Sequence, residues 1–333
     1  MANPNLSQAQ VITEPAEGAS RMETPLRFTA RHGDSLFGIL TRPTAQPRDI
    51  AVVFLNAATD RNRFIPRLAR RLAGRGFPVL RFDYRGFGES SGPWTGSEQK
   101  HALMHLATQE EPFADDAAAA VEELQRRGFR QFVLVGRCFG ARSALAAARY
   151  VPNLQGIALI SMPIHVGETG HPSERWALDH VRGAARRGFR LTLLRSLFSR
   201  RRRERWVRVL RQAGKQLIQK RKPPADGAGK EMAWVSESVV NGFRDVVSRR
   251  VPLLLLYGAD EVVYKDFELA RSGALGDVLA QGGPTVAVTT LDGPVNILSN
   301  VPIQEQVMHQ VTEWLEACAR RAEDLRGVGA EKV

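Results

Sequence analysis

Short apolar runs separated by helix-like segments constrain the fold of this chain more than any other feature of its sequence. Residues 50–55 (IAVVFL) and 131–135 (QFVLV) are almost entirely apolar, as expected for strands buried on both faces of a parallel sheet. Residues 64–73, 115–127 and 141–150 have helical patterns and alternate with such runs. This alternation predicts an α/β domain with a mostly parallel, doubly wound sheet.

Eight strands are predicted in all. Residues 25–31 and 35–41 alternate apolar and polar side chains around Gly33-Asp34, which predicts an antiparallel hairpin. The other six strands are predicted at residues 50–55, 77–82, 131–135, 156–161, 252–257 and 284–291. A closing helix is predicted from about residue 301 to residue 320, because its apolar residues recur at helical spacing.

The chain divides by composition into a tail, a core and one insertion. We expect residues 1–24 to be a flexible N-terminal tail and residues 25–161 and 251–323 to form the α/β core. Residues 162–250, between two predicted strands, are expected to form a helical insertion above the core. The two cysteines cannot form a multi-bridge framework, no apolar run is long enough to span a bilayer, and the N-terminus lacks the pattern of a secretory signal. We therefore expect a cytoplasmic protein.

The positive charge of the chain is concentrated in this insertion. The whole chain has 47 Lys and Arg against 35 Asp and Glu. Residues 174–222 alone hold 17 basic and 3 acidic residues, which leaves the rest of the chain close to neutral. Such a segment attracts anionic partners or is a solvated surface of the insertion. No nucleic-acid recognition motif accompanies it, so no nucleic-acid partner is expected.

The sharpest local motif is Gly136-Arg137-Cys138-Phe139-Gly140, between a predicted strand and a predicted helix. A strand, then G-x-nucleophile-x-G, then a helix is typical of a nucleophile elbow. The turn has no room for side chains at the two glycines, and it presents its middle residue at a helix N-terminus. The helix dipole, and the guanidinium of Arg137 if it points the right way, would favour a thiolate at Cys138. The alternative is a small cysteine packed in an alanine-rich turn.

These segments resemble the α/β-hydrolase fold over about residues 25–320. The matching pieces are VVFLNAATDRNRF, GFPVLRFDYRGFGESSG, FVLVGRCFGARSALAA, LLLLYGADE and LDGPVNILSN. They are most similar to a thioesterase- and serine-aminopeptidase-like branch that accompanies biosynthetic pathways and often has a cysteine in the elbow. The resemblance implies an eight-stranded, mostly parallel sheet with a helical lid, formed here by residues 162–250.

The resemblance also implies roles for particular residues. Cys138 would be the nucleophile, with an oxyanion hole formed by the main-chain N–H of Phe139 and that of Ala57 or Ala58. Asp260, after the predicted strand 252–257, would be the triad acid, although a turn or capping role is the alternative. No cofactor or metal is implied.

Asn296 stands where the family places its histidine. A carboxamide has no accessible pKa, so it cannot take a proton from a thiol or from water. A partly ionised cysteine can still attack an activated acyl group, whereas hydrolysis of the acyl-enzyme lacks a base. His165 follows a predicted strand at the same edge of the sheet and is the candidate surrogate base; an exposed histidine at the hinge of the lid is the alternative.

We therefore expect an acyl hydrolase or acyltransferase that acts on a thioester or activated ester through Cys138. The alternatives are a hydrolase-like pseudoenzyme or binding protein without turnover, and a non-hydrolytic cyclase or lyase that uses only the oxyanion hole. The expected partner is a small-molecule acyl substrate, presented on an acyl carrier protein or on coenzyme A. The basic lid would contact such an anionic partner or an anionic membrane surface.

Overall fold

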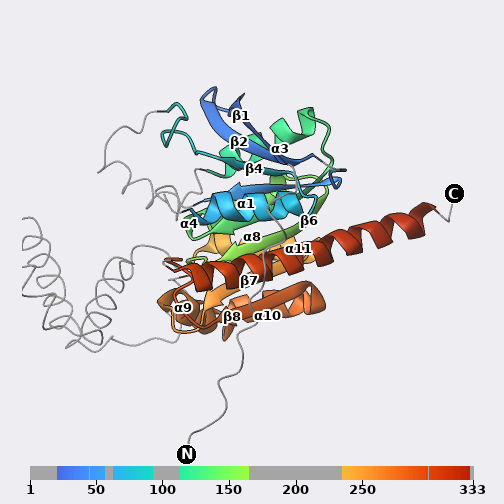
Figure 1. Ribbon diagram of the computed structural model, residues 1–333. Coiled ribbons are helices and arrows are strands. Elements are labelled where there is room, and N and C mark those ends of the chain that lie inside the picture. Colours follow the sequence, from blue (N-terminus) through green and yellow to red (C-terminus); the bar gives the residue numbers. More distant parts are fainter. Residues whose placement is uncertain are drawn as a thin grey trace, which may run out of the picture.

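The computed structural model describes residues 21–44, 46–56, 63–92, 113–164, 235–298 and 300–330. Within them, one eight-stranded sheet lies between two layers of helices (Figure 1). The strands are β1 Arg21–Thr29, β2 Ser35–Pro43, β3 Ile50–Leu55, β4 Val79–Phe82, β5 Gln131–Arg137, β6 Leu154–Ile160, β7 Leu253–Gly258 and β8 Val286–Leu291. All eight strands predicted from the sequence are present.

The strand order is β1-β2-β4-β3-β5-β6-β7-β8. Strands β3 to β8 pair in parallel, whereas β2 pairs antiparallel with both β1 and β4. Every residue of β3 is buried, as its continuous apolar sequence predicts for a central strand. The predicted hairpin forms with Thr29 opposite Ser35 and Arg21 opposite Pro43. Strand β1 begins at Arg21, so residues 21–24 of the predicted tail form part of the sheet.

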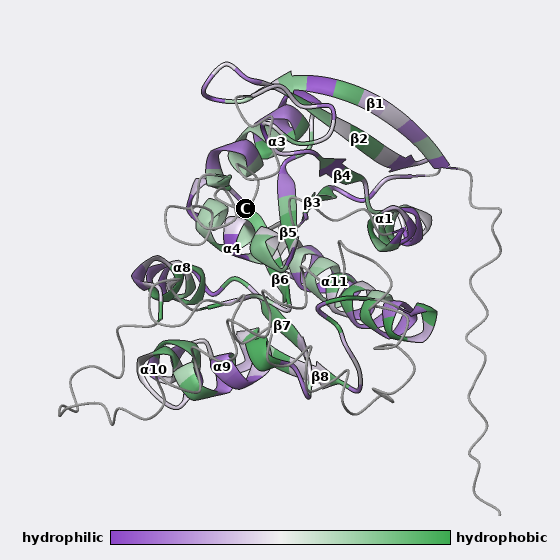
Figure 2. Ribbon diagram, turned by 90° about the vertical axis from the view of Figure 1, so that its left-hand side faces the viewer, coloured by the Kyte–Doolittle hydropathy of each residue, from purple (hydrophilic) through white to green (hydrophobic). Residues whose placement is uncertain are grey.

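The two faces of the sheet are covered by different helices. Helices α1 Phe64–Gly74 and α11 Val301–Ala330 pack on one face. Helices α3 Ala114–Arg126, α4 Phe139–Ala147 and α8 Glu237–Ser248 lie on the other, together with α9 Val262–Arg271 and α10 Ala274–Gln281. Figure 2 shows the hydrophobic strands between these two layers. Short 3-10 turns at Ala148–Tyr150 and Gly283–Thr285 follow α4 and precede β8.

Helix α8 lies within the predicted insertion and packs against the core. Residues 162–250 were expected to form a lid, but the buried side chains of Val239, Phe243 and Val246 place α8 in the same apolar cluster as Leu145 of α4. The core therefore resumes before residue 251, and α11 extends it past residue 323. The basic segment 174–222 lies outside the described residues. No helix among those that the structure describes is long and apolar enough to cross a membrane.

Candidate active site

Four side chains follow the carboxyl ends of neighbouring parallel strands. Cys138 follows β5, Ser161 follows β6, Glu261 comes shortly after β7, and Asn296 lies in the loop after β8. The carboxyl ends of parallel strands meet at one edge of the sheet, which is where open α/β sheets bind their ligands. This edge is the candidate active site.

Cys138 lies in a sharp turn between β5 and α4. Its φ of 52° and ψ of −122° fall in a region that non-glycine residues rarely adopt, and it is the residue that precedes the first turn of α4. Its main-chain N–H donates to the carbonyl of Ile160 at 2.8 Å, and its carbonyl accepts the N–H of Ala141 at 3.0 Å. These bonds hold a backbone conformation that costs about 1–3 kcal/mol, as is common at functional sites.

The two glycines of the motif are required by close backbone contacts. A Cβ on Gly136 would lie 2.5 Å from the Cα of Ala141. A Cβ on Gly140 would lie 2.2 Å from the carbonyl oxygen of Leu55 and 2.5 Å from that of Asn56. The turn is therefore as tight as the sequence predicts, and it packs directly against the end of β3.

The surroundings of Cys138 act on the pKa of its thiol in opposite directions. The side chain is half-buried, and burial raises the pKa of the thiol above its ordinary value. The positive charge of Arg137 and a hydrogen bond from the main-chain N–H of Phe139 lower this pKa, but they do not outweigh burial. The described surroundings thus disfavour the thiolate form of Cys138.

Of the expected oxyanion donors, only Phe139 can be located. It is the first residue of α4, and its N–H is directed at the Cys138 sulfur. Ala57 and Ala58, the other expected donors, lie outside the described residues, as does His165, the expected surrogate base.

The carboxylate that contacts the Asn296 loop belongs to Glu261 and not to Asp260, the predicted acid. Asp260 is exposed, whereas Glu261 is only 7% exposed. The Oε2 of Glu261 accepts hydrogen bonds from the Ser161 hydroxyl at 2.9 Å and from the Gly258 N–H at 3.2 Å. Its Oε1 accepts the main-chain N–H of Asn296 in a short hydrogen bond. The sequence presents two adjacent acids, and only the folded turn shows which one faces inward.

Burial raises the pKa of the Glu261 carboxyl, although its hydrogen bonds and the charge of Arg137 act to lower it. None of the three hydrogen-bond donors that contact Glu261 is an imidazole. These hydrogen bonds fix the loop of Asn296 and the end of β6 to the end of β7.

Arg137 is a site residue that the sequence prediction treated only as a conditional contributor to thiolate character. It is 5% exposed, and its Nη2 donates to the main-chain carbonyl of Asn296 at 2.5 Å. Burial lowers the pKa of the guanidinium, whereas the Cys138 thiolate and the Glu261 carboxylate would raise it. A buried cation thus lies among the nucleophile candidate, the acid and the Asn296 loop.

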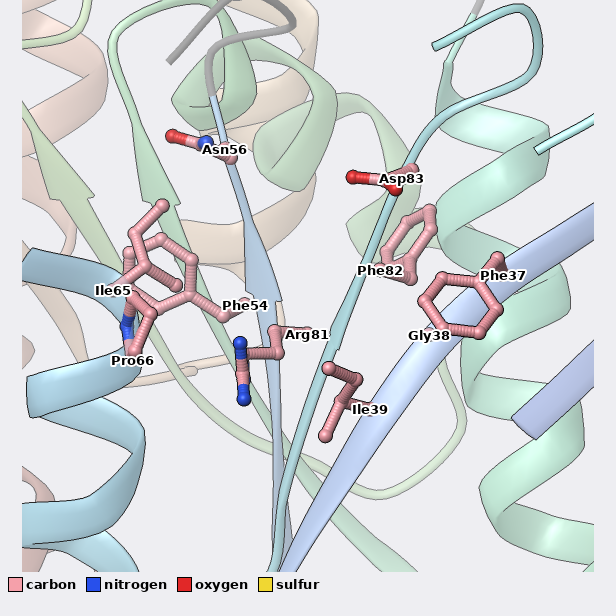
Figure 3. A pocket seen from close by; sticks show the side chains of 10 residues that line it. All are labelled: Phe37, Gly38, Ile39, Phe54, Asn56, Ile65, Pro66, Arg81, Phe82 and Asp83. Carbon is pink, nitrogen blue, oxygen red and sulfur yellow. The ribbon is translucent and has the colours of Figure 1, made fainter. Parts of the chain in front are cut away.

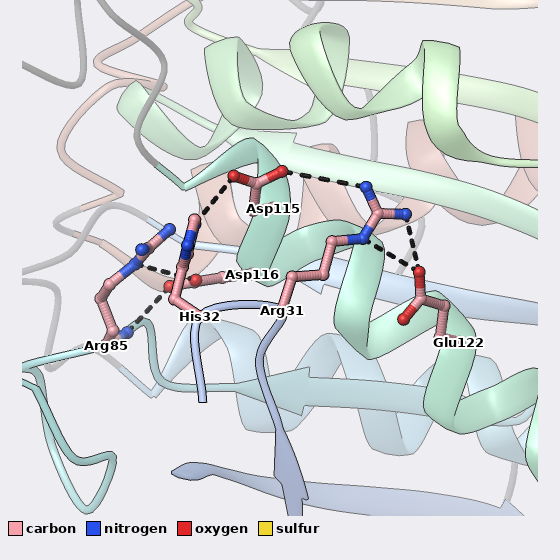
Figure 4. Close-up of polar contacts among 6 residues, drawn as sticks. All are labelled: Arg31, His32, Arg85, Asp115, Asp116 and Glu122. Atoms are coloured by element: carbon pink, nitrogen blue, oxygen red, sulfur yellow. Dashed lines mark hydrogen bonds and ion pairs between the residues drawn. The ribbon is translucent and has the colours of Figure 1, made fainter. Parts of the chain in front are cut away.

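The loop after β4, residues Asp83–Ser90, is joined to α3 by an ion pair outside the candidate site. The Arg85 guanidinium lies 3.0 Å from Asp116 of α3, and the Arg85 main-chain N–H donates to the same carboxylate at 2.9 Å (Figure 4). Nearby, the His32 ring lies 3.0 Å from Asp115. Asp116 is fully buried, and burial raises its pKa to about 6. These contacts give the loop a structural role.

Within the described part of the chain, no group of three or more His, Cys, Asp or Glu side chains has an arrangement that could bind a metal ion. The candidate site therefore offers a thiol, a main-chain N–H, a buried carboxylate, a buried guanidinium and a carboxamide. This set can support nucleophilic attack on a carbonyl, but it offers little general acid–base catalysis.

Comparisons with known proteins agree with this architecture. An esterase of Pyrococcus furiosus is 17% identical, with a TM-score of 0.57 over 89% of this chain and 91% of its own. A thioesterase domain from the curacin biosynthetic pathway is 16% identical, with a TM-score of 0.50 over 90% of this chain and 99% of its own. Proline iminopeptidase of Mycobacterium smegmatis is 15% identical, with a TM-score of 0.53 over 90% of this chain and 100% of its own.

At these identities the three structures establish the fold. The family described as serine aminopeptidase, S33, matches residues 46–268, which is more than half of the chain. This chain, with its eight-stranded sheet and its elbow at Cys138, therefore belongs to the S33 serine aminopeptidase family and has the α/β-hydrolase fold.

Proposed function

We propose that this protein is an acyl-transfer enzyme in which Cys138 accepts an acyl group from a thioester or an activated ester. The observation that carries the proposal is the conformation of Cys138, at φ 52° and ψ −122° before the first turn of α4. This conformation presents the thiol beside the N–H of Phe139, where an oxyanion would develop.

In the proposed reaction the Cys138 thiol loses its proton and the sulfur attacks the carbonyl carbon. The tetrahedral intermediate then collapses to a new thioester on Cys138 and releases the thiol or alcohol of the substrate, which takes up the proton. Because burial raises the pKa of Cys138, this attack is expected to speed up as pH rises above neutrality. Asn296 cannot deprotonate water, so we expect the acyl-enzyme to be resolved mainly by an amine or thiol acceptor.

The chain contains its own control for a labelling experiment. Cys318, its only other cysteine, is 4% exposed, and burial raises its pKa to about 12. After incubation with an octanoyl thioester of N-acetylcysteamine, mass spectrometry of tryptic peptides should find the acyl group on Cys138 and not on Cys318. Cys138→Ala should abolish the adduct. If iodoacetamide labels Cys138 but a panel of acyl thioesters does not, the proposal is wrong.

A second candidate function, that of a binding protein without turnover, is favoured by Asn296 and by the raised pKa of Cys138. Asn296→His separates the two functions, with Asn296→Gln as a matched control. If the site is otherwise built for catalysis, the histidine should speed thioester hydrolysis by about 10²-fold or more. No gain in a correctly folded variant that still fails to label would favour the binding protein.

A further inference from the structure

A cleft of about 260 Å³ lies between α1 and the face of the sheet formed by β2, β4 and β3 (Figure 3). Ile39, Arg81 and Phe54 are partners in the register of these three strands, so their side chains share this face. Ile65 and Pro66 of α1 form the opposite wall. The cleft thus has apolar walls and one guanidinium on its floor.

The charge of Arg81 is incompletely balanced. Its Nη2 lies 3.3 Å from the Oε1 of Glu23, but the same carboxylate also binds Arg70, at 3.0 Å through Oε1 and 3.2 Å through Oε2. The Nε of Arg81 is buried and finds no hydrogen-bond acceptor among the described residues. Burial lowers the pKa of Arg81 despite the negative charges of Glu23 and Asp83. A group that accepts hydrogen bonds would therefore be favoured at this guanidinium.

The other end of the cleft carries a carboxyl group instead of a guanidinium. Asp83 and Asn56 lie at the carboxyl ends of β4 and β3, and Figure 3 shows both at the end of the cleft away from Ile39. Asp83 follows Arg81 by two residues in the chain, which places their Cα atoms about 7 Å apart. Its Oδ2 accepts the Glu89 N–H at 3.2 Å. An anion is thus attracted at the Arg81 end and repelled at the Asp83 end, which gives a bound molecule a defined direction.

We propose that this cleft binds a small amphipathic carboxylate, with its carboxylate on Arg81 and its apolar body against Ile39, Phe54 and Ile65. A guanidinium has only donors, so it selects an acceptor and pairs best with a carboxylate. The cleft volume is just below the range of about 300–1,000 Å³ for ligand pockets, which limits the occupant to a small molecule. The proposal does not depend on chemistry at Cys138.

Calorimetric titration of the full chain with octanoate, octanamide and octylammonium tests the charge preference. We expect octanoate to bind at least about tenfold more tightly than octanamide, and octylammonium most weakly. Binding should be unchanged in Cys138→Ala, which separates this site from the acyl-transfer proposal. Equal affinity for octanoate and octanamide, or no saturable binding of octanoate, would overturn the proposal.

Three variants and a control locate the site. Arg81→Met should weaken octanoate binding by about tenfold or more, whereas Arg75→Met, which removes a surface arginine paired with Glu316, should not. Glu23→Gln removes the competing carboxylate and should tighten binding. If Arg81→Met fails to fold, Ile65→Trp fills the cleft without changing its charge and should abolish binding. Unchanged affinity in a folded Arg81→Met or Ile65→Trp variant would show that octanoate binds elsewhere.

Discussion

The Nη2 of Arg137 lies 2.5 Å from the main-chain carbonyl oxygen of Asn296, although the two residues are 159 positions apart. The residue before the elbow cysteine is thereby joined to the loop that follows β8. The N–H of Asn296 donates to Glu261 in the neighbouring loop after β7, so both main-chain polar groups of Asn296 are held by buried charged side chains.

Arg137→Met should release this loop and raise the pKa of Cys138 further. The change leaves the Asn296 carbonyl without its charged donor, which is expected to lower the free energy of unfolding by about 1.5–3 kcal/mol. It also removes the positive charge that favours the thiolate. The rate of iodoacetamide alkylation against pH measures the thiol pKa, and urea denaturation measures stability.

Arg137→Lys is the matched variant, because it retains the charge without the planar guanidinium. It should shift the alkylation profile less than Arg137→Met. Identical profiles for wild type and both variants would show that the charge of Arg137 does not act on Cys138.

Glu261→Gln and Asp260→Asn compare two neighbouring acids. Glu261 is buried and accepts three hydrogen bonds, so replacing it with an amide should lower the free energy of unfolding by about 1–3 kcal/mol. Asp260 is exposed, and its replacement should change stability by less than about 0.5 kcal/mol. Chemical denaturation of both variants checks the difference; a larger effect from Asp260→Asn would mean that the wrong acid has been placed in the site.

Gly140→Ala should destabilise the protein far more than the same change at the end of α1. Its Cβ would lie 2.2 Å from the Leu55 carbonyl oxygen, so β3 and α4 would have to move apart. We expect a loss of about 3 kcal/mol or more in unfolding free energy, together with loss of selective labelling at Cys138. Gly74→Ala in α1 is the control, because nothing lies within 4 Å of its added Cβ and alanine favours a helix. Comparable losses in both variants would contradict the tight turn.

Asp116 should make stability depend on pH in a definite direction. Its pKa is raised from 3.8 to about 6, chiefly by burial, so the folded state holds a proton that the unfolded state releases between about pH 4 and pH 6. Its contribution to the unfolding free energy therefore falls as pH rises through this window. The charges of Arg85 and His32 lower the pKa of Asp116 and oppose this effect, whereas the negative charge of Asp34 raises the pKa and adds to it.

Asp116→Asn removes this titration. Relative to wild type, the variant should gain stability from pH 4 to pH 7, by an amount on the order of 3 kcal/mol. Asp115→Asn is the matched control, because the Asp115 side chain is 34% exposed. Thermal denaturation across this pH range measures the difference; parallel curves for wild type and Asp116→Asn would show that Asp116 ionises normally.

The sequence by itself determined the strands and the elbow, because both depend on neighbouring residues. A continuous apolar run such as IAVVFL favours a strand that is buried on both faces. The motif G-R-C-F-G after a strand predicts a turn with no room for side chains at its two glycines. The replacement of a histidine by Asn296, inferred from the family resemblance, stays a prediction.

The tertiary structure alone decided how these parts act together. Whether Asp260 or Glu261 faces inward depends on one turn, and the contact of Arg137 with Asn296 joins segments that are distant in sequence. The raised pKa of Cys138 comes from desolvation by the packed surroundings, which outweighs the local effect of the helix N-terminus. Local sterics can be inferred from neighbouring residues, whereas desolvation and long-range pairing exist only once the chain has folded.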